Sequence, residues 1–162
     1  MASGIAPLIA AARPVSLLVL LCPGPLPTLQ GGPSALREGF PFPATRADGT
    51  NAWNADEAIA TMYRRLPRDT ARVLADRLQP MAPAPDEYPL PGHPEVPTVL
   101  VYASEDELFE PAVQRARGQA LLGEEPVEIQ SGHFPMVEDP DALVALLDVV
   151  ARQSTSEPGT NG

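Results

Sequence analysis

Three short runs of apolar residues alternate with segments in which apolar residues recur at helical spacing. The runs cover residues 15–21, 98–103 and 127–130, and Pro or Gly lies close to at least one end of each. Runs of this kind are typical of strands that are covered on both faces of a parallel sheet. Helical spacing predicts one helix over 111–121 and another that begins after Asp139. The alternation of strands and helices predicts an α/β fold with parallel strands.

The N-terminal half adds three predicted helices, over residues 4–12, 55–65 and 68–79. Pro7 is tolerated in the first of them only within the first turn, because proline has no backbone N–H and its ring clashes with the preceding turn. Asn54 precedes the second helix and can accept hydrogen bonds from its first backbone N–H groups. Apolar stripes on the last two helices indicate that both pack against other parts of the chain.

Two long connections rich in proline separate these elements. Residues 80–97 contain seven prolines, and residues 22–52 contain several more together with glycine. Both stretches are predicted to be loops, and loops of this length in a compact domain are usually functional or mobile. Across the chain, 21 of 162 residues are proline, but no Gly-x-y period appears, which excludes a collagen-like protein.

The balance of charges makes the chain a polyanion. The formal net charge is −10, and all eleven basic residues are arginine, a bias typical of a GC-rich, bacterial genome. Phosphate backbones and anionic membranes repel a polyanion, so neither nucleic acid nor a membrane is expected as a partner. Cys22 is the only cysteine, and the two histidines lie 40 residues apart. These counts exclude an internal disulfide and predict neither a metal site nor a cofactor.

Residues 15–22 allow two interpretations. The apolar run is too short to span a bilayer, but it could be the hydrophobic region of a signal peptide, with Arg13 as the positive charge. Against this, no small-residue cleavage site follows, and the large Leu21 precedes Cys22, where a lipoprotein signal has a small residue. We favour a buried strand and a cytoplasmic protein; an exported, lipid-anchored protein is the alternative.

Two residues suited to proton transfer follow the last two predicted strands. Asp106 lies three residues after the strand over 98–103, and His133 lies three residues after the strand over 127–130. A single helical crossover joins these strands, which predicts that they are parallel neighbours whose carboxyl ends share one edge of the sheet. Asp106 and His133 can meet there as the acid–base part of a nucleophilic triad. Alternatively, both are ordinary loop residues, and Glu138 either supports the histidine by hydrogen bonding or is exposed to solvent.

The sequence around these two residues resembles loops of α/β-hydrolases. The segment 97–111, PTVLVYASEDELFEP, resembles their penultimate strand and acid loop, and the segment 132–140, GHFPMVEDP, resembles their histidine loop. The resemblance implies that His133 is the catalytic histidine and Asp106 the acid, with Glu105 as the alternative acid. It also implies a serine-type hydrolase that acts on an ester or a related small substrate.

The resemblance extends upstream over most of the chain. Residues 51–63 resemble the small helical cap of the group that includes plant-type esterases and hydroxynitrile lyases, and residues 4–22 resemble the helix and strand that follow the nucleophile. The implied architecture is a partial α/β-hydrolase fold, with about three parallel strands, flanking helices and a small helical cap. Its parts are a core helix and strand at 1–22, Pro-rich loops and the cap at 23–97, a C-terminal core with the acid and histidine loops at 98–152, and a disordered tail at 153–162.

Three aromatic residues are candidates for substrate binding. Trp53 and Tyr63 lie in the segment that resembles the cap, and Phe134 follows His133. The resemblance implies that cap aromatics wall an acyl or aromatic pocket. The alternative for each residue is ordinary packing of the cap on the core.

The nucleophile of an α/β-hydrolase lies in a Gly-x-Ser-x-Gly turn between a strand and a helix, and the sequence contains no such motif. Ser34 and Ser131 lie in predicted loops, whereas Ser3 is followed by glycine and a helix but preceded by only two residues. We therefore expect the chain to be the C-terminal part of a hydrolase, through a gene-model error or a real truncation, that is active if completed by its N-terminal half. The alternative is an inactive remnant or a protein that only binds.

An incomplete sheet would also affect association. The strand over 15–21 is apolar on both faces, and we expect one of its edges to lack a neighbour. An open, apolar strand edge pairs with other chains or aggregates. The sequence therefore predicts self-association through this edge.

Overall fold

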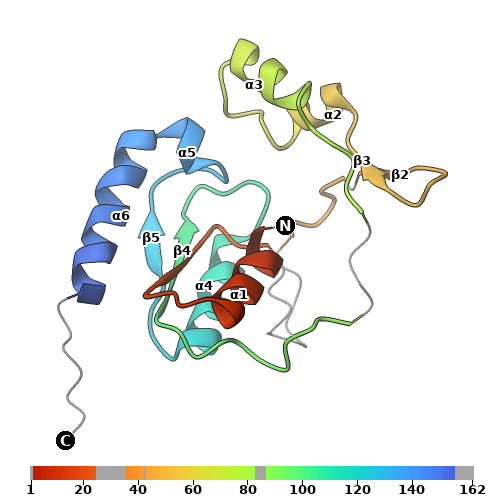
Figure 1. Cartoon of the computed structure of the whole chain (residues 1–162). Coiled ribbons are helices and arrows are strands. Elements are labelled where there is room, and N and C mark those ends of the chain that lie inside the picture. The colour runs from red at the N-terminus through yellow and green to blue at the C-terminus, as the bar shows by residue number, and fades with distance from the viewer. Residues whose placement is uncertain (1, 25–35, 42, 83–86, 156–162) are drawn as a thin grey trace, which may run out of the picture.

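The centre of the molecule is a sheet of three parallel strands in the order β1-β4-β5 (Figure 1). The computed structural model describes residues 2–24, 36–41, 43–82 and 87–155. The strands are β1 (Leu18–Leu21), β4 (Thr98–Ala103) and β5 (Val127–Ile129). The predicted number and direction of the strands are confirmed, although β1 starts at Leu18 and not at residue 15.

Helices cover both faces of this sheet (Figure 1). α1 (Ala2–Ala12) and α4 (Pro111–Leu122) lie on one face, where their apolar side chains pack against four buried residues of β1 and β4: Leu18, Leu20, Leu100 and Tyr102. α6 (Pro140–Thr155) packs through Leu143 on the other face, against Val101, Ala103 and Ile129. Within the described residues, no helix is both long and apolar enough to cross a membrane.

The crossover helix α4 has ends that the sequence determines. Pro111 occupies its first turn, where a missing backbone N–H costs nothing, and Gly123 ends it in the left-handed conformation with φ of 72°. A side chain at Gly118 would overlap the ring of Pro126. The glycine therefore lets α4 approach the segment that leads into β5.

A second unit, which we call the cap, comprises residues 44–78. It contains the hairpin β2 (Ala44–Thr45) and β3 (Asn51–Ala52) and the helices α2 (Ala55–Ala60) and α3 (Arg68–Ala75). Its own apolar cluster is formed by Ala58, Tyr63, Leu66, Ala71 and Ala75. Figure 1 shows the cap set apart from the sheet and its helices.

Several predicted helix boundaries are wrong. α2 ends at Ala60, because Thr61 leaves the helical region while its hydroxyl donates to the Glu57 carbonyl. α3 ends at Ala75, four residues before the predicted end at 79. α1 begins at Ala2, which places Pro7 beyond the first turn, in a buried position.

Other elements differ from the sequence prediction in kind. The hairpin of β2 and β3 lies in the stretch 22–52 that was expected to be a loop, and Asp48 stabilises its turn by accepting hydrogen bonds from Thr50. The short helix α5 (Pro135–Glu138) was not predicted. α6 continues to Thr155, into the expected tail at 153–162. Its Leu147 is 37 % exposed, whereas Leu143 and Val150 of the same helix are buried.

Candidate active site

Hydrogen bonds beyond the ends of β4 and β5 hold two loops together at the carboxyl edge of the sheet. The backbone N–H of Ser104 donates to the Ile129 carbonyl, and that of Glu105 donates to the Ser131 carbonyl, both at 3.0 Å. These two bonds continue the ladder between the strands into the loops. Asp106 follows on one loop, and His133 lies on the other.

The Asp106 carboxylate is completely buried and accepts four hydrogen bonds. Its Oδ1 accepts from the backbone N–H groups of Leu108 at 2.8 Å and Phe109 at 2.9 Å. Its Oδ2 accepts from Gln114 Nε2 at 2.9 Å and pairs with His133 Nδ1 at 2.8 Å. A buried carboxylate needs such donors, because burial without partners strongly disfavours a charge.

The imidazole of His133 is held in one orientation by this bond and by two aromatic rings. The rings of Phe109 and Phe134 meet it edge-on, with centroids at 5.1 and 4.8 Å. Its side chain is 16 % exposed. Because Nδ1 faces a carboxylate, it carries the proton of the neutral ring, which leaves Nε2 with a lone pair able to accept another proton.

The structure places Asp106, and not Glu105, against the histidine. Glu105 is exposed and forms an ion pair with Arg65 at 2.5 Å. The predicted contact between Asp106 and His133 is therefore present, and the alternative contact through Glu105 is not.

Glu138 holds the histidine loop in place by accepting hydrogen bonds from its backbone. Its Oε2 accepts the backbone N–H of Gly132 at 2.9 Å, and its Oε1 accepts that of Phe134 at 3.2 Å. A Cβ at position 132 would lie 2.5 Å from both carboxylate oxygens and 2.7 Å from Nε of Arg65. A side chain at position 132 would therefore displace Glu138 or Arg65 from the contacts they make here. Of the two roles considered for Glu138, the structure shows the supporting one.

Two neighbouring arginines of the cap reach these loops. Arg65 donates to Glu138 at 2.9 Å and also to Glu105, so one guanidinium joins the acid loop to the histidine loop. Arg64 forms a two-pronged ion pair with Glu107, which raises the pKa of the guanidinium and lowers that of the carboxyl. These contacts were not predicted, because the partners lie 40 to 73 residues apart in the sequence.

A third arginine ties another segment to the acid loop. Arg37 donates through Nε and Nη2 to the backbone carbonyl of Asp106, at 3.2 and 2.9 Å, and its Nη1 lies 3.2 Å from Glu110. The backbone N–H of Arg37 also donates to the Leu108 carbonyl. The acid loop is thus contacted by arginines from two distant parts of the chain.

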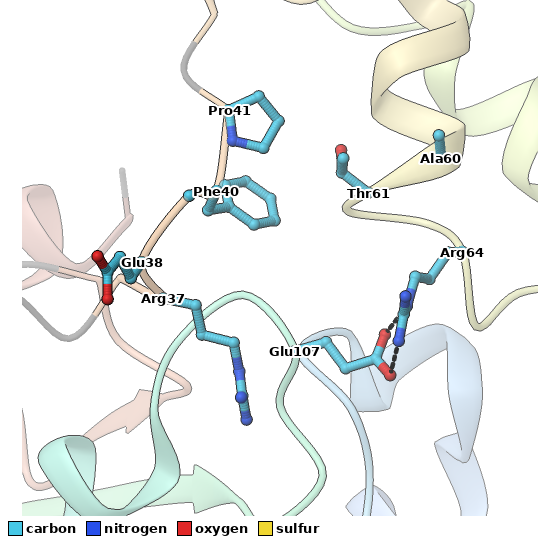
Figure 2. A pocket seen from close by; sticks show the side chains of 9 residues that line it. Arg37, Glu38, Phe40, Pro41, Ala60, Thr61, Arg64 and Glu107 are labelled. Carbon is cyan, nitrogen blue, oxygen red and sulfur yellow. Dashed lines mark hydrogen bonds and ion pairs between the residues drawn. The ribbon is translucent and has the colours of Figure 1, made fainter.

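A cavity of about 430 Å³ opens beside the acid loop (Figure 2). One wall is the segment from Arg37 to Pro41, the other is the end of α2 with Thr61 and Arg64, and Glu107 lies at the base. Figure 2 shows the Phe40 ring between the two walls. Apolar and charged groups therefore share this cavity.

The three aromatic candidates for substrate binding do not form a single group. Tyr63 and Phe134 lie together, with ring centroids 5.1 Å apart, and Phe134 also contacts His133. The ring contact of Trp53 is instead with Phe40, at 6.0 Å. Tyr63 also packs in the apolar cluster of the cap.

Two described side chains, those of Ser131 and Cys22, carry a hydroxyl or a thiol just after a strand of the sheet. Ser131 lies after β5 with a buried hydroxyl that has no hydrogen-bond partner among the described residues. Burial and the nearby Asp106 raise the pKa of the Cys22 thiol to about 12, so this thiol stays protonated and is a poor nucleophile. Ser34 lies outside the described residues, and Ser3 falls within α1.

No potential metal centre is found in the described part of the chain, where no three His, Cys, Asp or Glu residues converge. The buried acid and the histidine supply groups for proton transfer at this site. Such a pair can remove a proton from a nucleophile and return it to a leaving group.

Known proteins share the fold of this chain. The family model described as "Alpha/beta hydrolase family" matches residues 2–146. The chain is similar in structure to a methylesterase protein from Arabidopsis, with 19 % sequence identity and a TM-score of 0.64, over 93 % of this chain and 66 % of that one. It is also similar to the thioesterase domain from the curacin biosynthetic pathway, with 17 % identity and a TM-score of 0.48, over 93 % and 63 % of the two chains. The chain thus spans just under two thirds of each. No curated protein matches it.

Proposed function

Because this chain belongs to the α/β-hydrolase family, we propose that it contributes the acid and the histidine of a serine-type site that hydrolyses an ester or a related small substrate. The observation that carries this proposal is the 2.8 Å contact between Oδ2 of a fully buried Asp106 and Nδ1 of His133. A histidine oriented in this way by a buried carboxylate is the proton-transfer unit of acyl-transfer enzymes.

In the proposed reaction, Nε2 of His133 takes the proton of the nucleophilic hydroxyl as that oxygen attacks the ester carbonyl. Asp106 stabilises the imidazolium that forms and keeps the ring in the Nδ1–H tautomer. The imidazolium then gives its proton to the leaving alcohol, and an acyl-enzyme remains. A water molecule, deprotonated by the same Nε2, releases the acid and restores the hydroxyl.

We place the nucleophile on polypeptide outside these 162 residues, so that the chain is the truncated form of a longer hydrolase. The absence of a Gly-x-Ser-x-Gly motif from the sequence supports this. So does β1, which has a hydrogen-bonded neighbour on only one side within the described residues. The same free edge supports self-association of this chain.

For the substrate, we propose that Phe134 and Tyr63 form the wall beside His133 and that Trp53 lines a more distant part of the site. The chain of ring contacts from His133 through Phe134 to Tyr63 supports the first assignment. The contact between Trp53 and Phe40, a residue that lines the 430 Å³ cavity, supports the second.

The proposals on nucleic acid and membranes rest on the net charge, and the proposal on location rests on the strand formed by residues 18–21. The net charge of −10 argues against nucleic acid and anionic membranes, and we propose a reaction without a cofactor. We also propose a cytoplasmic location, because residues 18–21 of the candidate signal region form a strand hydrogen-bonded to β4.

The second candidate is a protein that keeps the fold but does not catalyse. It is favoured by one observation, the lack of a nucleophile motif in the sequence. Such a protein would retain the pair of Asp106 and His133 without turnover.

The test compares the 162-residue chain with the polypeptide obtained by extending the reading frame upstream of Met1. We expect no hydrolysis of a short-chain nitrophenyl ester by the first, and hydrolysis by an extended form that carries Gly-x-Ser. In the active form, His133→Ala should lower kcat/KM by a factor of about 10³ to 10⁴, whereas the control His93→Ala should not. An inactive extended form, or a frame without Gly-x-Ser, would favour the second candidate. Hydrolysis by the 162-residue chain that Ser3→Ala abolishes would place the nucleophile at Ser3.

A further inference from the structure

Gln114 is the one side chain other than His133 that binds the Asp106 carboxylate within the described residues. It lies in the second turn of α4, is 2 % exposed, and donates from Nε2 to Oδ2 of Asp106 at 2.9 Å. Oδ2 is the same oxygen that faces Nδ1 of His133. Gln114 and the histidine therefore share one carboxylate oxygen.

Burying the Gln114 amide costs folding free energy unless its polar atoms form hydrogen bonds. Its Oε1 is buried and has no hydrogen-bond partner among the described residues. A buried acceptor without a partner destabilises the folded chain, and an apolar side chain of the same length would avoid that cost. The amide is thus placed for its donor group, which reaches Asp106.

We infer that Gln114 is a positioning residue, whose amide donor fixes Oδ2 of Asp106 so that the carboxylate presents one lone pair to Nδ1 of His133. This inference rests on the proposed function of the pair, although its test needs no turnover. The two backbone N–H groups at Oδ1 hold one oxygen only. Without Gln114, Oδ2 has a single donor, and the carboxylate can rotate about its bond to Cβ.

A neutral amide suits this role better than a charged group. An arginine or lysine at position 114 would compete with His133 for the negative charge of Asp106 and weaken its hold on the imidazolium. The amide leaves the carboxylate charge in place. Gln114 thereby restrains the geometry of the pair without neutralising it.

The experiment measures the tautomer of neutral His133 in the 162-residue chain by ¹⁵N NMR of the imidazole nitrogens. Gln114→Met keeps the length and volume of the side chain but has no donor. Gln114→Glu keeps a donor, because two carboxylates at this distance cannot both ionise and one retains its proton. The matched control is Gln119→Met, which makes the same exchange at an exposed position of the same helix.

We expect the native chain, Gln114→Glu and Gln119→Met to keep the Nδ1–H tautomer. In Gln114→Met, the ratio of the Nε2–H to the Nδ1–H form should rise about tenfold, the effect of one lost hydrogen bond. If that variant does not fold by circular dichroism, Gln114→Asn, whose amide is too short to reach Oδ2, should show the same rise.

The opposite behaviour of the two Gln114 variants would overturn the inference. If Gln114→Met keeps the tautomer and Gln114→Glu loses it, the residue fills space and does not position the acid. Failure of the extended polypeptide to hydrolyse esters would instead overturn the proposed function, and it would leave this spectrum unchanged.

Discussion

The corner that holds Asp106 and His133 and the sheet edge along β1 are built in contrasting ways. At the corner, both oxygens of Asp106 and both oxygens of Glu138 accept hydrogen bonds. Along β1, Val19 and Leu21 are only half-buried, and Ile5 of α1 is 54 % exposed. The corner therefore supplies donors to both of its carboxylates, whereas the β1 edge leaves apolar surface open to solvent. The hydrogen bonds at the corner should therefore persist when residues of the β1 edge are changed. Self-association through β1 should likewise persist when residues of the corner are changed.

Removing the acid should cause the largest loss. Asp106→Ala leaves two backbone N–H groups, the Gln114 amide and the His133 imidazole without their acceptor. We expect the free energy of unfolding to fall by about 3 kcal/mol or more, measured by urea denaturation. The control Asp141→Ala, at an exposed site in α6, should change it by no more than about 0.5 kcal/mol. Equal effects of the two changes would show that the corner does not stabilise the fold.

A methyl group at the histidine loop should have the next largest effect. In Gly132→Ala, the new Cβ would lie 2.5 Å from the Glu138 carboxylate, so the loop or the glutamate must move. We expect a loss of about 1–3 kcal/mol and a shifted NMR signal of His133. Gly92→Ala is the matched control, because no heavy atom lies within 4 Å of a Cβ built there. An unchanged His133 signal in Gly132→Ala would show that Glu138 does not hold this loop.

Loss of the link between the cap and the corner should cost less. Arg65→Gln removes ion pairs with Glu105 and Glu138 that are partly exposed, so we expect about 1 kcal/mol or less. Amide hydrogen exchange in α2 should become faster at low salt, and the difference from the native chain should shrink at high salt. The control Arg77→Gln changes an exposed arginine of the cap. Equal exchange rates in both variants would mean that Arg65 does not hold the cap in place.

A change at the β1 edge should act mainly on association. Val19→Lys places a charge on the edge strand, which disfavours pairing with another chain. We expect light scattering after size exclusion to show a shift from oligomers towards the mass of one chain. The control Val73→Lys alters an apolar residue of α3 that is 50 % exposed. A native chain that is already monomeric would refute self-association through β1.

The sequence predicted those features that depend on short-range patterns. Continuous apolar runs identify β1, β4 and β5, and one crossover between parallel strands suffices to bring Asp106 to His133. Pro111 and Gly123 mark the ends of α4 for the same reason, since each acts within its own turn.

Features that depend on distant partners could not be predicted. Arg65 looks like any exposed cap residue until Glu105 and Glu138 are brought beside it. Gln114 lies in a helix, and helical periodicity does not predict its hydrogen bond to Asp106, which precedes the helix by several residues. The hairpin of β2 and β3 has strands of only two residues each, too short for a periodic pattern.

The two histidines provide the most direct test of the central claim, that an ordered acid–histidine pair is already present in this chain. His93 contacts Oγ1 of Thr98 through Nε2 at 2.8 Å, and that hydroxyl donates to the Val96 carbonyl, so His93 must carry its proton on Nε2. His133 faces Asp106 through Nδ1 and must carry its proton there. The ¹⁵N spectrum of the neutral imidazoles should therefore show opposite tautomers, Nε2–H for His93 and Nδ1–H for His133. An Nε2–H tautomer at His133 would contradict the pairing with Asp106 and with it the proposed catalytic role.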